Sequence, residues 1–207
     1  MKLANLIIRW IVFILLFCCK SSIISQTIIP DDFSEYYHRV ANLPTVSMVK
    51  TANGVLVPKY LMDLDFLDGY RMPTFQANDL GGKDLNVNYN DGLTLLNFWF
   101  IACTPCVEEI PFLNELQKKY LAKLNIVSIC RDPEPYILNF MENHPINYTI
   151  VPNAENLIDN HFKMTWGYPK NILINSDGKV LAMTRGFKGT EDVNYQKIEK
   201  LIEQNTK

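Results

Sequence analysis

The sequence has few of the residues that build metal centres or disulfide networks. It contains five cysteines in 207 residues, and no second closely spaced pair follows Cys103 and Cys106. Its three histidines, His38, His144 and His161, are scattered along the chain, whereas a structural zinc site needs about four ligands at recognisable spacing. We therefore expect no metal, no other cofactor and no structural disulfide framework.

An excess of basic residues is also missing. With 20 lysines and arginines against 22 acidic residues, the formal net charge is −2, and no basic patch favours nucleic acid as a partner. The chain also lacks the composition of a disordered protein, since 48% of its residues are hydrophobic and 20% are charged. Its length predicts one globular domain with extensions.

The amino terminus lacks an apolar run long enough for a comfortable membrane span. Lys2 and Arg9 precede an apolar segment over residues 10–19, which has the charge and length of the hydrophobic region of a signal peptide. We therefore expect residues 1–25 to be a signal peptide or a membrane or lipid anchor, and the protein to be exported.

Two adjacent cysteines at the end of this segment would allow a lipid anchor. Cys18 or Cys19 could be the lipid-bearing residue of a lipoprotein, although the bulky Phe17 fits that pattern poorly. The alternatives are cleavage near Ser25 and an uncleaved anchor. In each case the expected location is the periplasm or the periplasmic side of a membrane.

One stretch brings a cysteine to the start of a helix. The apolar run over residues 93–102 is typical of a central strand that is buried on both faces. Residues 107–121 then show apolar side chains near helical spacing. Unpaired backbone N–H groups and the positive end of the helix dipole stabilise a thiolate at a helix N-terminus. Cys103 is therefore the candidate nucleophile.

Cys106 is the candidate partner of this nucleophile. Two intervening residues bring it within bridging distance of Cys103, and Pro105 suits the first helical turn because that turn needs no N–H there. A mixed disulfide on Cys103 could then be resolved by Cys106. Half of a zinc site and two inert core cysteines are the alternatives.

The residues around this pair resemble those of the thioredoxin superfamily, and within it the extracytoplasmic thiol-disulfide oxidoreductases of the TlpA/ResA type. The pattern of that family reads roughly F-W-A-T-W-C-x-P-C-x-x-E-x-P, and it is matched here by Phe98, Trp99, Cys103, Pro105, Cys106, Glu109 and Pro111. The resemblance implies an α/β fold over residues 70–207, with a mixed central sheet flanked by helices. It also implies a protein disulfide as substrate, usually reduced, and a membrane electron donor.

A second stretch, residues 166–178, resembles the G-x-P-x-x-x-L-I-D-x-x-G block of the same family. The resemblance implies that Pro169 follows a cis peptide bond and faces the cysteine pair across the active site. The backbone beside such a proline can pair with a substrate chain, as in β-strand addition. Pro169 is therefore a candidate site residue.

The chain departs from its relatives at positions that matter for proton transfer. Thioredoxin has a buried Asp where this chain has Asn97, and Asn cannot take a proton. Glu109 lies three residues after Cys106 on the same side of the helix, so it is the candidate to relay the Cys106 proton. Lys170 follows the proline, where it could lower the pKa of Cys103 or point to solvent.

The remaining pattern predicts the other elements of this fold and an extension before it. We expect residues 26–69 to form an extension that contains a short helix and a hairpin turning at residues 53–54. A second hairpin, over residues 72–87, should turn at Gly81 and Gly82 through positive φ angles. The later elements expected are strands at 124–130, 148–151 and 179–185 and helices at 136–143, 156–162 and 193–202.

Two other functions remain as alternatives, and the role of one further cysteine is open. Peroxiredoxins share this fold, but in their P-x-x-x-T-x-x-C pattern the threonine position is occupied here by Phe100. Copper chaperones of this fold use C-x-x-x-C and a distant His, and the spacing here is one residue short. A peroxidase and a non-enzymatic metal-binding module are thus the alternatives. Cys130 could be an auxiliary thiol or a small buried hydrophobe.

Overall fold

The computed structural model describes most of the chain after residue 66. The described residues are Tyr36, 48–50, Gly54, 56–58, 67–164 and 167–206, all within the compact unit Asp31–Lys207. The predictions for the segment 1–25, for lipid attachment at Cys18 or Cys19 and for most of the extension 26–69 lie outside these residues. In the part that the structure describes, no helix has the length and apolar character to cross a membrane.

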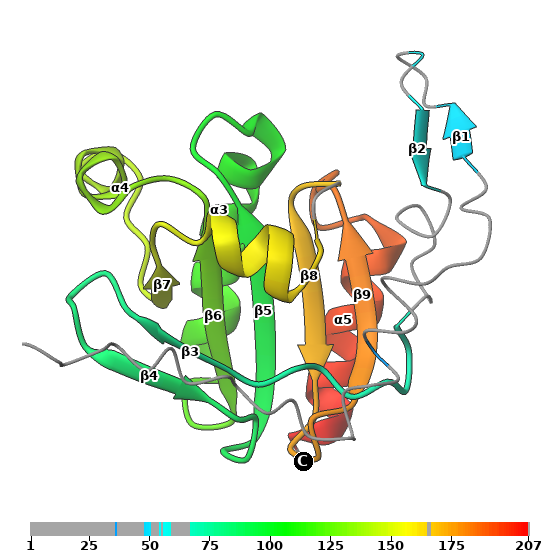
Figure 1. Ribbon diagram of the computed structural model, residues 1–207. Helices are drawn as coiled ribbons and strands as arrows, with labels where there is room; N and C mark the ends of the chain where they lie inside the picture. Colours follow the sequence, from blue (N-terminus) through cyan, green and yellow to red (C-terminus); the bar gives the residue numbers. More distant parts are fainter. Residues whose placement is uncertain are drawn as a thin grey trace, which may run out of the picture. The chain divides into compact units, whose positions relative to one another are not determined.

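A five-stranded mixed sheet forms the centre of the fold (Figure 1), as predicted. Its strand order is β7-β6-β5-β8-β9. The strands are β5 (Leu93–Trp99), β6 (Leu124–Cys130), β7 (Thr149–Val151), β8 (Lys170–Ile174) and β9 (Val180–Arg185). β5 pairs in parallel with β6 and antiparallel with β8, so it is hydrogen-bonded on both sides.

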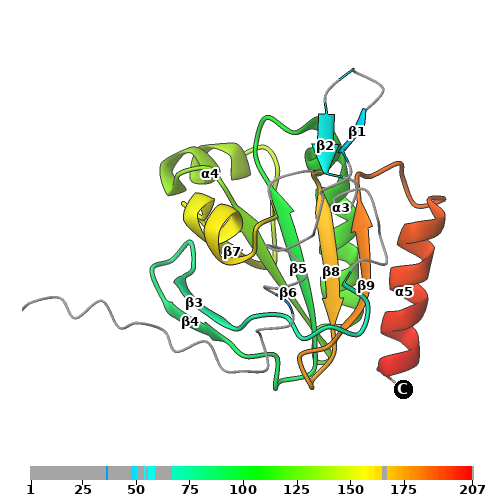
Figure 2. The same ribbon diagram turned by 45° about the vertical axis from the view of Figure 1, so that its right-hand side comes forward.

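β5 separates two hydrophobic clusters because its side chains alternate between the two faces of the sheet. Leu93, Leu95 and Trp99 pack with the helices α3 (Thr104–Lys119), α4 (Glu134–Met141) and α5 (Val193–Asn205). Leu96 and Phe98 pack on the other face with η3 (Leu157–His161). Figure 1 shows α5 behind the sheet and the yellow η3 in front of it, and Figure 2 shows α5 beside β9. All seven residues of β5 are buried.

Two antiparallel hairpins precede the central sheet, at the predicted places. They are β1 (Met48–Lys50) with β2 (Leu56–Pro58), and β3 (Phe75–Asn78) with β4 (Asp84–Val87). In the second turn Gly82 has φ +77°, but the prediction of a positive φ for Gly81 is wrong. The carboxylate of Asp79 organises that turn instead, because its Oδ1 accepts the N–H groups of Gly81 and Lys83 at 2.8 and 2.9 Å.

Some predicted elements differ in type or bounds. The helix expected at residues 156–162 is the π-helix η3, in which Phe162 N–H donates to Leu157 O, five residues back. The helix expected at 136–143 begins earlier as α4, since a proline in its first turn needs no N–H partner there. From the extension, Tyr36 is helical and fully buried, and its hydroxyl donates to Phe162 O at 2.6 Å.

Candidate active site

The cysteine pair lies where β5 turns into α3, as predicted. Cys103 is the N-cap residue of α3, with extended backbone angles, and Cys106 N–H donates to its carbonyl oxygen at 2.9 Å. The two cysteines form a disulfide with their Cα atoms 5.2 Å apart. Both residues are buried, and Cys103 is slightly more exposed (7%) than Cys106 (2%).

The carboxylate of Asp132 holds the loop before Cys103. Its Oδ2 accepts Ile101 N–H at 2.7 Å, and the thiol of Cys130 lies 3.5 Å from the same oxygen. Cys130 is free and fully buried, and burial raises the pKa of its thiol. Cys130 is therefore a neutral buried side chain at the end of β6.

Pro169 lies in a turn that contacts the same loop. The Tyr168–Pro169 peptide is cis, as the resemblance implies. The ring of Tyr168 packs edge-on against Phe100, with centroids 5.4 Å apart, and Phe100 is three residues before Cys103. Gly186 N–H donates to Pro169 O at 2.7 Å, which attaches the turn to the end of β9.

Arg131 fixes the position of Tyr168 from the other side. Its Nε donates to the Tyr168 hydroxyl at 3.1 Å, and its guanidinium forms an ion pair with Asp159 of η3. The Tyr168 hydroxyl in turn donates to Met164 O at 2.9 Å. These contacts hold the proline turn between the end of β6 and η3.

Glu109 lies on the inward face of α3, three residues after Cys106, and is fully buried. Its Oε1 accepts the side-chain N–H of Asn171 at 2.6 Å, and its Oε2 accepts that of Asn97 at 3.0 Å. Burial raises the pKa of Glu109 to about 8, although both amide hydrogen bonds act in the opposite direction. The neighbouring Glu108 is exposed.

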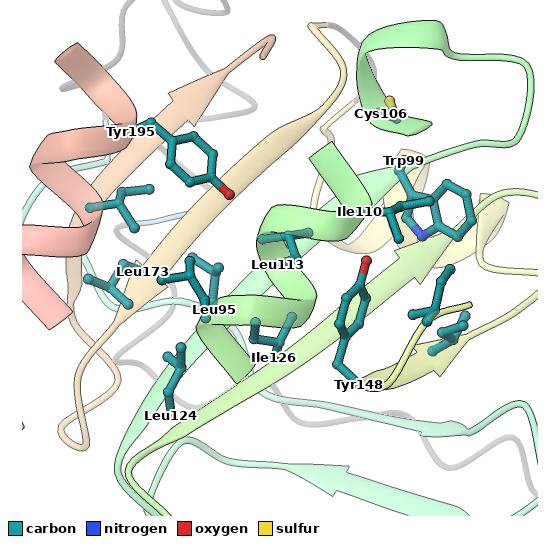
Figure 3. Packing of buried hydrophobic residues seen from close by; sticks show 14 of the residues in the cluster. Leu95, Trp99, Cys106, Ile110, Leu113, Leu124, Ile126, Tyr148, Leu173 and Tyr195 are labelled. Atoms are coloured by element: carbon teal, nitrogen blue, oxygen red, sulfur yellow. The ribbon is translucent and has the colours of Figure 1, made fainter. Parts of the chain in front are cut away.

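Besides its two asparagine partners, Glu109 acts electrostatically on two buried tyrosines, Tyr148 and Tyr195. Figure 3 shows Cys106 and Trp99 at one end of the buried cluster, and Tyr195 of α5 at the other. Burial, followed by the charge of Glu109, raises the pKa of both Tyr148 and Tyr195. Both tyrosines are therefore neutral hydroxyls at physiological pH.

Known proteins with the same pattern identify the chemistry. The sequence profile of the Redoxin family matches residues 67–201. The chain belongs to the redoxin family. The thiol-disulfide oxidoreductase ResA of Bacillus cereus is 31% identical over 140 residues, which are 63% of this redoxin and 78% of that relative. ResA of Bacillus subtilis is 26% identical over 122 residues, which cover 58% of this redoxin and 68% of that relative.

Solved structures agree with this family assignment at the level of the fold. The thioredoxin domain of a thiol-disulfide oxidoreductase from Bacteroides vulgatus matches with a TM-score of 0.55 at 24% identity, over 65% of this redoxin and 97% of that chain. A thiol:disulfide interchange protein from Bacteroides sp. matches with a TM-score of 0.56 at 23% identity, over 66% of this redoxin and 90% of that chain. This redoxin is a thiol-disulfide oxidoreductase with a thioredoxin-like fold and a CxxC pair at Cys103 and Cys106.

Lys170 of this redoxin does not point to solvent, which excludes one of its two alternatives. Its side chain is 1% exposed, and its Nζ lies 3.5 Å from the sulfur of Met164. Lys170 pairs with Phe98 across the sheet and lies on the face opposite to Asn171, because neighbouring residues of β8 alternate. Burial, and then the nearby charge of Arg185, lower its pKa to about 7.

Sequence reasoning missed Asn171 as a partner of Glu109, and it treated Asn97 only as a lost acid. The two asparagines lie directly opposite each other in β5 and β8. The register between β5 and β8 would have revealed this pair of asparagines. That register is known only from the folded sheet. Among the described residues, no group of three or more His, Cys, Asp or Glu side chains could hold a metal ion.

Proposed function

We propose that this redoxin works outside the cytoplasm and reduces disulfide bonds in protein substrates. The observation that carries the proposal is the disulfide-bonded cysteine pair at the start of α3, with Cys103 as the N-cap residue. In the reduced enzyme, the Cys103 thiolate attacks one sulfur of the substrate disulfide and releases the other as a thiolate. Cys106 then attacks the Cys103 sulfur, which releases the second substrate thiol and leaves the Cys103–Cys106 disulfide.

Glu109 is proposed to manage the proton of the resolving step. Cys106 must lose its proton to attack, and the carboxylate of Glu109 lies one helical turn away on the same inward face. Burial raises the pKa of Glu109 to about 8, so near neutral pH this side chain can both accept and release a proton.

Pro169 is proposed to position the substrate chain beside Cys103. The proline turn contacts the loop that precedes Cys103 through Tyr168 and Phe100. The backbone next to the proline offers hydrogen-bonding groups to an extended peptide, as in β-strand addition. This arrangement suits a substrate that is an unfolded polypeptide segment with a disulfide.

The amino-terminal residues are proposed to bring this chemistry to the periplasm. The charge and apolar pattern of residues 1–25 supports a signal peptide or a membrane or lipid anchor. Residues 26–69 would form the extension and residues 70–207 the catalytic domain. The resemblance to the TlpA/ResA family supports a membrane electron donor and, as one substrate class, apocytochrome c thiols held as a disulfide.

A redox titration tests the direction of the reaction. The purified protein is equilibrated in glutathione or dithiothreitol buffers, and free Cys103 and Cys106 are counted by alkylation and mass spectrometry. A reductase should have a midpoint near the value of about −270 mV found for thioredoxin. A midpoint near about −120 mV, the value of the oxidant DsbA, would refute reduction as the physiological direction.

Glu109→Gln tests the proton step. Loss of the carboxylate should lower the turnover of a peptide disulfide about a hundredfold near pH 8 and remove the part of the pH profile that follows Glu109. Turnover is measured between pH 5.5 and 9.5 with dithiothreitol as reductant. Glu108→Gln, at the exposed neighbour, is the matched control and should keep the native profile. An unchanged profile for Glu109→Gln would remove Glu109 from the mechanism.

A further inference from the structure

Asn171 connects the proline turn to the buried carboxylate of Glu109. It is the second residue after the cis proline and lies 62 residues from Glu109 in sequence. Its side-chain amide donates to Glu109 Oε1 at 2.6 Å, which is shorter than the 3.0 Å bond from Asn97 to Oε2. Asn171, Asn97 and Glu109 are 1%, 2% and 0% exposed, so water does not compete for these contacts.

The surrounding contacts agree with amides that face Glu109 with their N–H groups. Asn97 Nδ2 donates to Asn171 Oδ1 at 2.9 Å as well as to Glu109, and Asn97 Oδ1 accepts the Ser128 hydroxyl at 3.3 Å. Asn171 Nδ2 also donates to Thr184 Oγ1 at 3.3 Å. Turning either amide around would place its carbonyl oxygen against a Glu109 oxygen. Both asparagines therefore present only N–H donors to Glu109.

A carboxylate accepts from two such donors at once, whereas a carboxylic acid turns one of its oxygens into a donor. The two amides therefore favour the charged form of Glu109, and burial favours the neutral form. We propose that Asn171 is a positioning residue of the redoxin reaction, which controls the protonation of Glu109 through the hydrogen bond to Oε1. This inference rests on the proposed role of Glu109.

The proton step balances without any further reactant. The Cys106 thiol gives its proton to the Glu109 carboxylate, and the thiolate then attacks the Cys103 sulfur of the mixed disulfide. Before the transfer, the N–H of Asn171 holds Oε1 in place. The same N–H opposes the proton transfer, because it stabilises the negative charge of the Glu109 carboxylate. Removing this N–H should therefore make Glu109 hold its proton up to a higher pH.

Other titrating groups around Glu109 stay neutral over the relevant pH range. Tyr148, before β7, and Tyr195, on α5, have pKa values raised well above their usual range. Cys130 on β6 is a buried thiol with a raised pKa. In the oxidised protein Cys103 and Cys106 do not titrate, because they form the disulfide. A titration of the oxidised protein near pH 8 therefore reports Glu109 itself.

The test is a carbon-13 NMR titration of the glutamate carboxyl groups in oxidised full-length protein. In Asn171→Leu, the loss of a hydrogen bond to a charged group should raise the apparent pKa of Glu109 by about one to two units. Asn171→Asp keeps the side-chain shape and replaces the donor by an acceptor, so it should also move the titration upward. Thr184→Ser is the matched control, because it keeps the hydroxyl that accepts the Asn171 N–H and leaves the Asn171–Glu109 hydrogen bond intact. It should leave the titration in place.

The outcomes separate this inference from the proposed function. If Asn171→Leu and Asn171→Asp leave the Glu109 titration at the native pH, the inference is wrong. If Asn171→Leu does not fold, the isosteric Asn171→Asp decides by the same criterion. If the Glu109 titration moves to higher pH and the pH profile of turnover moves with it, the inference about Asn171 and the proposed role of Glu109 are both supported. If the titration moves and the turnover profile does not, Asn171 controls Glu109 as inferred, and the proposed relay role of Glu109 fails.

Discussion

Cys103→Ser is expected to lower the disulfide-reductase activity by at least about a thousandfold, because a serine hydroxyl is a far weaker nucleophile than a thiolate. Cys103 is the N-cap of α3 and the more exposed residue of the pair, so we expect that Cys106 does not replace it. The measurement is the turnover of insulin disulfides with dithiothreitol, compared with the rate of dithiothreitol alone. Full activity in Cys103→Ser would refute the mechanism.

Two further cysteine variants sharpen this test. Cys106→Ser should still attack the substrate but not resolve the mixed disulfide, so a covalent enzyme–substrate complex should appear on a non-reducing gel. Cys130→Ser is the control, because Cys130 is buried and belongs to no disulfide. It should keep near-native activity. A covalent complex that forms through Cys130 would contradict this assignment.

Lys170→Met is expected to raise the free energy of unfolding at pH 7 by about 4 kcal/mol. Burial lowers the pKa of Lys170 from 10.5 to about 7, and one pKa unit corresponds to about 1.4 kcal/mol. Methionine has a similar unbranched shape and carries no charge, so it removes this cost. Urea unfolding followed by tryptophan fluorescence measures the change. Lys179→Met, at an exposed lysine, should change stability by less than about 0.5 kcal/mol.

The pH dependence of this gain has a definite sign. Between about pH 7 and pH 10.5 the unfolded chain binds the Lys170 proton more tightly than the folded chain does, so the Lys170 contribution to stability increases with pH. The difference between Lys170→Met and the native protein should therefore be largest below pH 7 and shrink toward pH 10.5. A difference that is absent or constant across this range would show that Lys170 is not a buried neutral amine.

The parts of the site that depend on local sequence were predictable. The run of seven buried residues in β5 and the helical spacing that follows it place Cys103 at a helix start, and the structure has it there. The two residues between Cys103 and Cys106 bring the cysteines close enough to form a disulfide. The cis bond before Pro169 followed from the family resemblance alone.

The parts that depend on register between distant strands were not predictable. Asn97 and Asn171 are 74 residues apart, and only the pairing of β5 with β8 brings their amides together. Lys170 and Asn171 are adjacent polar residues at the start of one strand, and alternation sends them to opposite faces. Nothing in the local pattern tells which of the two faces Glu109. For this reason the local sequence could not exclude the alternative in which Lys170 points to solvent.

The polar group around Glu109 has a consequence for how this protein can change in evolution. Its five side chains come from α3, β5, β6, β8 and β9: Glu109, Asn97, Ser128, Asn171 and Thr184. Each is buried, so replacing one by an apolar residue leaves a donor or acceptor of its neighbour unsatisfied, at a cost of about 1–3 kcal/mol. Lineages that alter one of these positions should therefore alter a second, and the five should be inherited as a set.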